Sequence, residues 1–376
     1  MSTKKLLVMV GLLCLTITAC AKQQTITVSN PSAIHRTEEV VEVQWSALRG
    51  FKPEAVTVTE NGKQLPVQMI YNGETTPQAL LFPVTIAKYE TKKYKIQTGK
   101  PQTFPARTFG RKVPERKDDF AWENDKVVYR VYGPALAPEY PSNGYDMWLK
   151  NTNQLIVNKF YKDDLENHKP YHINYGEGLD CYKVGHTLGA GAIAPFLHDT
   201  IWVENNYTTV KVLDSGILRT SFELTYDSVQ VGNRFLNEKL VITLDAGSNF
   251  NKAQVEYSGD FHEIELAAGI FLHDKIGVIT QDPQNSWIAY AENAVSDAGV
   301  PEGRSYVGVV FSTPVKQYYQ NKKHVAGVLP YAQGAKLTYY FGGGWSQAGF
   351  ASDEDWTKCV ENQAALIVAP LKIRLF

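Results

Sequence analysis

Apolar and polar residues alternate along the stretch Leu218-Arg219-Thr220-Ser221-Phe222-Glu223-Leu224-Thr225-Tyr226. Such alternation puts the apolar side chains on one face of a β-strand, against a core. Similar runs occupy residues 127–132, 208–213, 240–244, 253–257, 306–311 and 337–341. Helical patterns are weak; the best is 353–365, which Ser352 or Asp353 can cap. We therefore predict an all-β fold.

The strands fall into two groups joined by a linker. Residues 20–100 carry short alternating runs separated by turn signals, including the hairpin sequence Asn61-Gly62, and predict a small β-sandwich. Residues 101–119 are rich in Pro, Arg and Lys and are expected to form a linker. Residues 120–376 carry longer strands, which predict a large antiparallel domain of two stacked sheets with a site on one concave face.

The first residues are typical of a targeting segment. Lys4 and Lys5 precede an apolar run, 6–18, that is too short to span a membrane. The run ends in Thr18-Ala19-Cys20, so 1–19 are expected to be a lipoprotein signal and Cys20 the lipidated residue. An ordinary secretory signal with an accidental Cys is the alternative. We expect the protein in the bacterial cell envelope, anchored only through this lipid. Because no acidic stretch follows Cys20, the periplasmic face is favoured.

Composition and motifs exclude several classes of protein. The net charge of −1, from 38 basic and 39 acidic residues, argues against a nucleic-acid partner. Cys181 and Cys359 could pair in an oxidising compartment, but no Cys pattern indicates zinc. The sequence has no phosphate-binding loop, nucleophile elbow or dinucleotide fingerprint. No cofactor is expected, although His198 and Asp199 could join other residues in space to hold a divalent metal.

The densest group of reactive side chains lies in the segment 171–186, which we call the polar segment. It reads Tyr171-His172-Ile173-Asn174-Tyr175-Gly176-Glu177-Gly178-Leu179-Asp180-Cys181-Tyr182-Lys183-Val184-Gly185-His186. Its glycines allow tight turns and close approach to a ligand. Its His, Tyr, Lys and carboxyl groups are those used for proton transfer. We therefore expect the active site here.

The chain resembles a family of lipoprotein-like proteins of polysaccharide-using bacteria. That family includes an ulvan oligosaccharide dehydratase, and other members are labelled unsaturated rhamnogalacturonyl hydrolases. The resemblance covers roughly 105–376. Its motifs are Arg111-Lys112-Val113-Pro114-Glu115-Arg116, Tyr129-Arg130-Val131-Tyr132-Gly133-Pro134, Gly144-Tyr145-Asp146-Met147-Trp148-Leu149-Lys150 and Gly176-Glu177-Gly178-Leu179-Asp180.

The resemblance implies a reaction and a fold. The reaction is removal of water from a glucuronic or iduronic acid at the non-reducing end of ulvan-type oligosaccharides, giving a 4,5-unsaturated uronic acid. The partner is therefore a uronic acid-containing oligosaccharide. The implied fold is the supersandwich of mutarotases and several polysaccharide lyases, which agrees with the strand pattern.

Such an elimination needs a base near C5, a group that neutralises the carboxylate, and an acid for the departing 4-hydroxyl. We expect His172 to act as the base or to polarise the carboxylate, and Tyr175 to complete the acid/base pair. A phenol titrates near pH ~10, so Tyr175 needs a cationic neighbour. Lys183 and His186 are the candidates. A structural role is the alternative for each of these side chains.

Further residues are expected to bind the substrate: Arg130, Tyr145, Trp148, Asp180, Tyr182 and His262. Arg130 is a candidate clamp for the carboxylate, since a guanidinium binds it bidentately. If 180–184 is a strand, Asp180 and Tyr182 share one face. Three other functions stay open: a hydrolase of uronic acid-rhamnose oligosaccharides, a mutarotase-like epimerase, and a sugar-binding protein without catalysis.

Overall fold

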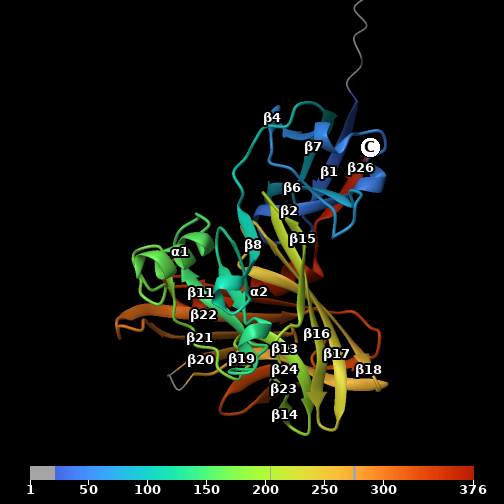
Figure 1. Ribbon diagram of the computed structural model, residues 1–376. Coiled ribbons are helices and arrows are strands. Elements are labelled where there is room, and N and C mark those ends of the chain that lie inside the picture. Colours follow the sequence, from blue (N-terminus) through green and yellow to red (C-terminus); the bar gives the residue numbers. More distant parts are fainter. Residues whose placement is uncertain (1–21, 204, 274–276) are drawn as a thin grey trace, which may run out of the picture.

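The computed structural model describes residues 22–203, 205–273 and 277–376 (Figure 1). The predicted signal sequence, 1–19, and the predicted lipid site at Cys20 lie outside the described residues. In the part of the chain that is described, no helix combines the length and apolarity needed to cross a membrane.

The N-terminal unit is a small sandwich of two antiparallel sheets. One sheet has the order β26-β1-β7-β3-β4 and the other the order β2-β6-β5. Its strands are β1 (Gln23–Ser29), β2 (Arg36–Gln44), β3 (Val56–Glu60), β4 (Lys63–Gln64), β5 (Gln68–Ile70), β6 (Ala79–Ile86), β7 (Thr91–Thr98) and β26 (Lys372–Leu375). The expected hairpin turn joins β3 to β4, where Asn61 and Gly62 have φ values of 50° and 83°. The predicted hairpin is therefore confirmed.

The larger unit is built from three antiparallel sheets. Their orders are β12-β11-β10-β9-β8, β14-β13-β19-β24-β23 and β15-β16-β17-β18-β25-β22-β21-β20. The first half comprises β8 (Thr108–Val113), β9 (Asp119–Asn124), β10 (Val128–Val131), β11 (Tyr145–Lys150), β12 (Gly178–Asp180), β13 (Ala190–Leu197), β14 (Thr200–Ile201), β15 (Thr209–Ser215) and β16 (Arg219–Val231). The second half comprises β17 (Arg234–Asp245), β18 (Phe250–Gly259), β19 (Glu263–Phe271), β20 (Val278–Asp282), β21 (Trp287–Val295), β22 (Pro301–Phe311), β23 (Gln317–Gln320), β24 (His324–Ala332) and β25 (Leu337–Trp345).

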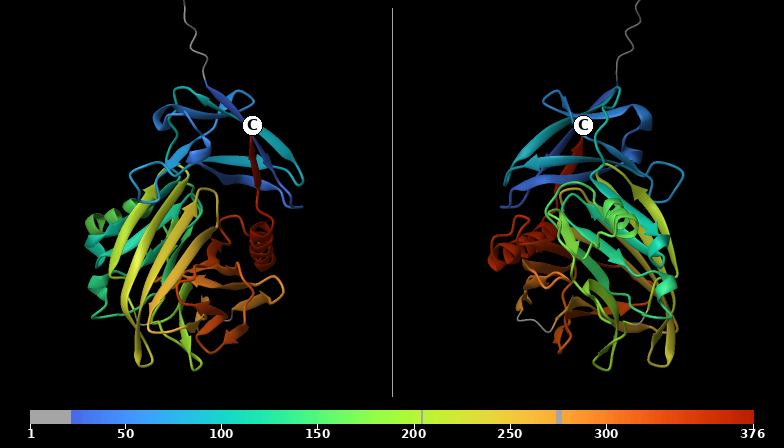
Figure 2. Two further views of the ribbon diagram at one scale, coloured as in Figure 1. Left: turned by 90° about the vertical axis from the view of Figure 1, so that its right-hand side faces the viewer. Right: turned by 60° about the vertical axis from the view of Figure 1, so that its left-hand side comes forward.

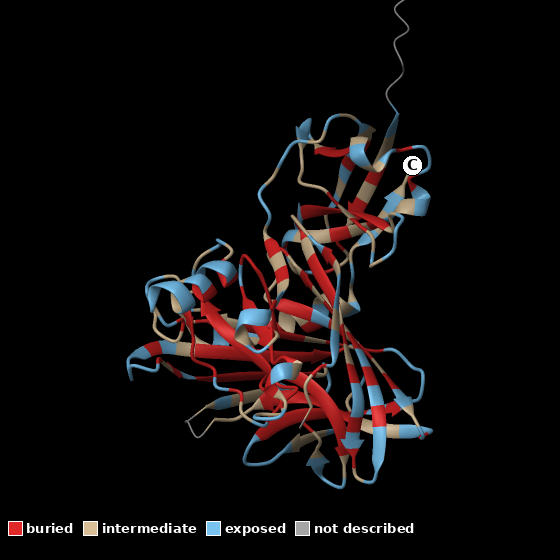
Figure 3. Cartoon of the chain, in the orientation of Figure 1, coloured by how far each residue is buried: buried red, intermediate tan, exposed pale blue. Residues whose placement is uncertain are grey.

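One continuous apolar core joins the three sheets, and Figure 3 shows it as buried strands through the middle of the unit. The alternation seen in the sequence is visible in β16, where Phe222, Leu224 and Tyr226 are buried. Burying one face of each strand stabilises this arrangement by removing apolar surface from water. The predicted all-β, sandwich-type fold is confirmed.

Two expected boundaries differ from the structure. Residues 108–113 of the expected linker form β8, which pairs with β9 in the larger unit. The tail, expected within the domain 120–376, ends in β26, which pairs with β1 of the N-terminal sandwich (Figure 2). The exposed edge of β1 has unpaired backbone groups, and β26 satisfies them. The local pattern of a strand does not say which distant edge it will join.

Buried polar contacts fix the two units together. The side-chain oxygen of Gln68 accepts hydrogen bonds from the backbone N–H groups of Leu218 and Arg219, at 2.7 and 2.8 Å. The carboxylate of Asp214 accepts from the N–H groups of Tyr71 and Asn72. These bonds saturate backbone groups at the junction, so the units are held in one orientation.

One of the two α-helices described was predicted from the sequence and the other was not. The predicted helix is present as α2 (Asp353–Val368), with Ser352 and Asp355 forming a capping box. The helix α1 (Val157–Asn167) was not predicted, because it has no capping side chain of its own. Instead the carboxylate of Glu123, on β9, accepts hydrogen bonds from the N–H groups of Ile156 and Val157. The short 3₁₀ helices described are η1 (Trp45–Ala47), η2 (Pro53–Ala55), η3 (Pro114–Arg116) and η4 (Pro134–Leu136).

Candidate functional site

The outer face of the sheet β8–β12 carries an unusual row of buried charges. Strand pairing puts Arg130 of β10 opposite Asp146 of β11, and β12 brings Asp180 to the next strand. Side chains alternate across a sheet, so these residues point away from the main core. Helix α1 and the start of the polar segment cover this face. We call Arg130, Asp119, Asp146, Asp180 and Tyr171 the Arg130 cluster.

The guanidinium of Arg130 holds the cluster together. Its Nη2 lies 2.7 Å from Oδ2 of Asp146 and 2.9 Å from Oδ2 of Asp180. Its Nη1 donates to the hydroxyl of Tyr171 at 3.1 Å, and its Nε lies 3.8 Å from Asp119. Arg130 is only 3% exposed. A buried carboxylate is costly without a paired cation, and here one cation serves several acids.

Burial and the neighbouring charges shift the pKa values of the acids in the Arg130 cluster. Burial, followed by the neighbouring charge of Asp146, raises the pKa of Asp180 to about 6. The surrounding cations, first among them Arg130, limit that shift. Burial also raises the pKa of Asp119. A second guanidinium, that of Arg116 on η3, is half-buried beside Tyr171 and Asp119. The cluster therefore contains an acid that changes charge in the weakly acidic range.

His172 stands at the edge of this cluster with one ring nitrogen fixed. Its Nδ1 lies 2.9 Å from the main-chain oxygen of Asp180 and 3.5 Å from Oδ2 of the same residue. Because a carbonyl oxygen only accepts, Nδ1 carries the hydrogen. Among the described residues Nε2 has no hydrogen-bond partner, and the side chain is 31% exposed. A neutral His172 therefore presents a lone pair on Nε2.

Lys183 is linked to His172 through Asp297. Its ammonium is 2.6 Å from Oδ1 of Asp297, whose backbone N–H donates to the main-chain oxygen of His172 at 3.3 Å. The Lys183 side chain is 54% exposed, and its charge acts on Asp180. An exposed cation is thus connected to the backbone of His172 and influences Asp180, which His172 contacts.

A second polar group, which we call the Glu292 cluster, contacts the backbone of Lys183. Nδ1 of His273 is 2.8 Å from Oε1 of Glu292, although the carboxylate is out of line with the N–H direction. The hydroxyl of Tyr290 donates to Oε2 at 3.1 Å. Nε2 of His273 donates to the main-chain oxygen of Lys183 at 2.9 Å. Burial and the charge of Glu292 raise the pKa of Tyr290.

The other expected catalytic residues lie apart from His172. Tyr175 is exposed, and its ring packs beneath the ammonium of Lys169 at 4.2 Å. In the described residues no hydrogen bond or ring contact joins Tyr175 to His172. His186 is exposed and its ring contacts Tyr140. Of the four residues expected to be catalytic, the structure brings together His172 and Lys183.

The expected shared face of Asp180 and Tyr182 is wrong. The strand β12 ends at Asp180, and Lys183 has a φ of 59°, so the alternation stops. Asp180 faces Arg130, whereas Tyr182 is buried in the main core and its hydroxyl donates to the main-chain oxygen of Gly189. Local sequence did not reveal where the strand ended.

The remaining expected binding residues are mostly enclosed. Arg130 lies on the same face of the sheet as Val128, as expected. Its guanidinium donates to Tyr171 and Asp180 inside the protein, so it is not exposed to a substrate. Trp148 is buried and stacks on Tyr171, with ring centroids 5.1 Å apart. Tyr145 is 1% exposed inside the main core. His262 is exposed just before β19, whereas His273 follows the far end of that strand.

The sequence pattern assigned no role to several members of the site, namely Arg116, Asp119, Tyr171 and Glu292, whereas Asp146 was considered for the sugar pocket and His273 was a lower-ranked candidate. The alternation within β10 and β11 was a usable signal, because Arg130 and Asp146 can face each other when these two neighbouring strands pair. No such signal exists for His273 and Glu292, which reach the polar segment from distant strands.

The described part of the chain contains neither a cluster of metal ligands nor a disulfide bond. There, no group of three or more His, Cys, Asp or Glu side chains is arranged to hold a metal ion. Absence of a cofactor stays a prediction. Cys181 is buried in the main core and Cys359 lies on α2, and the structure contains no disulfide between them.

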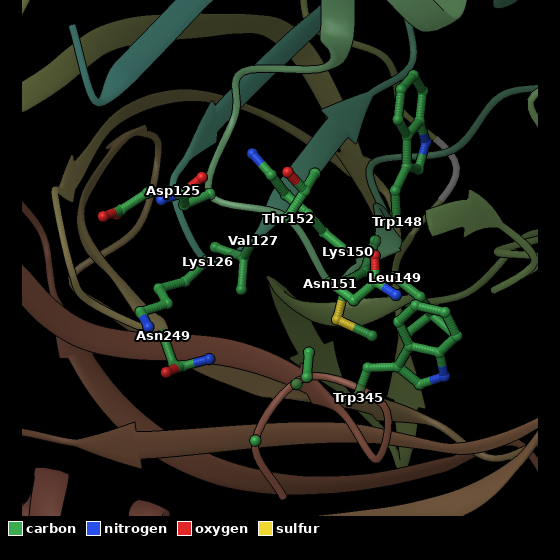
Figure 4. Close-up of a pocket in the computed structure, with 15 residues that line it drawn as sticks. Asp125, Lys126, Val127, Trp148, Leu149, Lys150, Asn151, Thr152, Asn249 and Trp345 are labelled. Carbon is green, nitrogen blue, oxygen red and sulfur yellow. The ribbon is translucent and has the colours of Figure 1, made fainter. Parts of the chain in front are cut away.

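A separate cavity of about 350 Å³ opens where β11 ends (Figure 4). It lies between the turn from β9 to β10 and the loop that follows β25. None of the four residues expected to be catalytic lines it. Trp148 contributes to the wall, but its indole points away from the other lining side chains. The reactive groups, rather than the cavity volume, therefore mark His172 as the candidate catalytic position.

The fold and site define an all-β protein of sandwich type with a charged cluster beside an accessible histidine. The chain belongs to the family described as "Domain of unknown function (DUF4861)", whose model matches residues 28–373. It is similar to a protein of Formosa agariphila named "Uncharacterized protein P7". The two are 29% identical over 383 residues, which covers 95% of each chain.

The solved structures that match the chain are much more distant. A protein in glycosyl hydrolase family 38 from Enterococcus faecalis matches 94% of this chain and 47% of its own, with 9% identity and a TM-score of 0.44. The family GH92 inverting mannosidase BT2199 from Bacteroides thetaiotaomicron matches 61% of this chain and 31% of its own, with 15% identity and a TM-score of 0.30. The chain thus spans less than half the length of these two proteins.

Proposed function

We propose that this protein is a carbon-oxygen lyase that removes water from a terminal glucuronic or iduronic acid of ulvan-type oligosaccharides. One observation carries the proposal: His172 donates from Nδ1 to the main-chain oxygen of Asp180 and has no bond at Nε2 among the described residues. A histidine held in this tautomer is suited to accept a proton. The resemblance of the polar segment to a family with a dehydratase supplies the substrate class.

In the proposed reaction, Nε2 of His172 removes the proton from C5 of the uronic acid. The electron pair of the C5–H bond forms the C4=C5 double bond, and the C4–O bond breaks. Lys183 is the proposed cation for the substrate carboxylate, because its side chain is exposed and its charge acts on Asp180, which His172 contacts. Neutralising that carboxylate makes the C5 proton more acidic. The products are an unsaturated uronic acid and water.

Tyr171 is the proposed acid for the departing hydroxyl group. Its oxygen accepts a hydrogen bond from Nη1 of Arg130, so its own O–H hydrogen is available to another acceptor. Its ring lies 4.5 Å from that of His172, measured between centroids. Tyr171 replaces Tyr175 in this role because Tyr175 packs against Lys169 instead.

The hydrolase alternative has less support. Glycoside hydrolysis commonly uses two carboxyl groups on opposite sides of the scissile bond. Asp146 and Asp180 both approach the same nitrogen of Arg130, and both are buried. That arrangement leaves no space for a sugar between them.

The test follows the ultraviolet absorbance of the conjugated double bond. The purified protein is mixed with saturated-end oligosaccharides of ulvan, and in parallel with those of pectin. We expect absorbance to rise with ulvan fragments and the rise to be lost in His172→Ala. Tyr171→Phe should reduce it by about a hundredfold or more, the usual range for general acid catalysis.

His262→Ala is the matched control, because His262 is an exposed histidine just before β19, at the opposite end of that strand from His273. It should retain full activity. Unchanged absorbance with every saturated substrate would reject the elimination. A fall in absorbance on oligosaccharides that are already unsaturated would support the hydrolase instead.

We further propose that the protein is exported and held at the periplasmic face of the cell envelope by a lipid on Cys20. The motif Thr18-Ala19-Cys20 supports this proposal. Cells expressing the full chain should incorporate labelled palmitate into it, and Cys20→Ser should abolish the label. Label that persists in this variant would reject the proposed anchor.

We propose that the reaction needs no cofactor, because the proposed base, cation and acid are all side chains. Activity should therefore survive extensive dialysis against a chelator. Loss of activity that a divalent metal restores would overturn this proposal.

A further inference from the structure

We propose that the cavity at the end of β11 is a second binding site, which takes a saccharide unit carrying one anionic group, a carboxylate or a sulfate ester. The cavity measures about 350 Å³, within the usual range of small-molecule sites. The proposal does not depend on the elimination reaction, because none of the proposed catalytic residues lines the cavity.

The charges that line the cavity favour an anionic ligand. Asp125 is compensated by Arg107, whose Nε donates to its carboxylate at 2.9 Å. Lys150 is buried and its ammonium is 2.8 Å from Oε2 of Glu123. Lys126 is exposed and forms no ion pair with another described residue. After these compensations, one positive charge is left at the cavity.

That charge belongs to a residue that lines the cavity. Figure 4 shows the side chain of Lys126 extending toward Asn249, another residue that lines the cavity. Lys126 follows a backbone turn that is fixed by Asn124, whose side-chain oxygen accepts from the N–H of Lys126 at 2.8 Å. The backbone of Lys126, from which the side chain extends, is therefore held in an ordered turn.

Neutral polar groups around the cavity match sugar hydroxyls. The amide nitrogen of Asn249 donates to the main-chain oxygen of Gly343, and its oxygen accepts no hydrogen bond from a described residue. The hydroxyl oxygen of Thr152 accepts from the N–H of Gln154, so its hydrogen can be donated elsewhere. Sugar hydroxyls both donate and accept, so one free acceptor and one free donor suit them.

The floor of the cavity is apolar and rigid. Met147 and Trp345 belong to the main core, and the indole N–H of Trp345 donates to the main-chain oxygen of Glu302. A small apolar base with a few polar groups above it is the usual composition of a ligand site. A single cation fits one carboxylate or sulfate better than a nucleotide, whose several phosphate charges would need more cations.

The experiment compares methyl glucuronoside, methyl glucoside and a sulfated methyl glucoside. Each is titrated into the mature protein while the indole N–H signal of Trp345 is followed by NMR, with Trp345→Phe used for assignment. We expect both anionic ligands to shift this signal. Lys126→Ala should weaken their affinity about tenfold, equivalent to about 1.4 kcal/mol, and leave the neutral glucoside unaffected.

Two variants control for general charge effects and for the hydroxyl contacts. Lys322→Ala removes an exposed lysine from the turn between β23 and β24 and should leave binding unchanged. Asn249→Asp keeps the size of the side chain but adds a negative charge, so it should weaken the anionic ligands more than the neutral one. Equal loss in Lys322→Ala and Lys126→Ala would overturn the proposal, because it would indicate non-specific attraction.

The titration is repeated in His172→Ala to separate the cavity from the catalytic proposal. Binding that depends on Lys126 and persists in His172→Ala supports the second site. Binding that His172→Ala abolishes and Lys126→Ala leaves intact would overturn it, because the ligand would then be at His172. If the protein shows no elimination activity but binds the anionic ligands in a way that depends on Lys126, only the lyase proposal is rejected.

Discussion

Two buried carboxyl groups, those of Asp180 and Glu238, differ in the cations around them. Asp180 lies 2.9 Å from Nη2 of Arg130, and burial raises its pKa to about 6. Glu238 is in the main core, where its Oε2 accepts a 2.6 Å hydrogen bond from the hydroxyl of Tyr257. Burial raises its pKa to about 8, and the hydrogen bond from Tyr257 only partly opposes that shift.

The comparison teaches that burial alone makes an acid neutral, whereas a paired cation keeps it able to ionise in the range where the protein works. Desolvation disfavours the charged form in both positions. Of these two acids, only Asp180 lies beside a guanidinium and next to a histidine ring. The outer face of β9–β12 is therefore suited to proton transfer, while Glu238 is a neutral part of the core near neutral pH.

The largest expected effect comes from removing the cation. Arg130→Met leaves Asp146 and Asp180 buried without their shared partner, and we expect the free energy of unfolding to fall by about 3–5 kcal/mol. Denaturant unfolding measures this change. Arg234→Met is the control, because Arg234 is exposed in the hairpin between β16 and β17. It should change stability by at most about 0.5 kcal/mol. A similar small effect for Arg130→Met would show that the buried acids do not need the guanidinium.

The second prediction tests the neutral state of Glu238 through the pH dependence of stability. Its pKa in the folded state, about 8, is above its ordinary value of 4.5. Between those values the folded protein holds a proton that the unfolded chain releases. This difference in bound protons therefore lowers the free energy of unfolding as pH rises, by about 1.4 kcal/mol per pH unit, until Glu238 ionises.

Glu238→Gln should remove this slope, because the amide is neutral at every pH and still accepts from Tyr257. At pH values above 8 the variant should be more stable than the wild type. Unfolding curves across the window from pH 4.5 to 8 make the comparison. Parallel curves for the two proteins would mean that Glu238 is ionised in the core, and the contrast with Asp180 would be lost.

The smallest expected effect concerns Asp180 and the proposed reaction. Activity should rise as pH increases through about 6, because ionised Asp180 lies 3.5 Å from Nδ1 of His172 and stabilises the protonated ring. Asp180→Asn keeps the main-chain oxygen that orients His172 but lacks this charge. We expect about a tenfold loss of kcat/KM above pH 6 and a weaker rise around it. An unchanged pH profile would assign the rise to another group.

Local sequence patterns determined much of the architecture. Alternation in stretches such as 218–226 predicted strands with one buried face, and Asn61-Gly62 predicted the hairpin between β3 and β4. Ser352 predicted the start of α2. The density of His, Tyr and charged residues in 171–186 marked the segment that contains His172. These features depend on neighbouring residues, so they can be read without knowing the fold.

Only the tertiary structure decided how distant residues meet. Glu123 caps α1 from another strand, β26 completes the sheet of β1, and Arg130 is covered by Tyr171. Because Arg130 is enclosed, it is the cation of a buried cluster and not the expected clamp for a substrate carboxylate. Strand order and the covering of each sheet face depend on long-range pairing and burial, which no local pattern specifies. The sequence therefore identified a segment rich in titratable side chains, and the packing of the sheets determined which of them are enclosed and which are exposed.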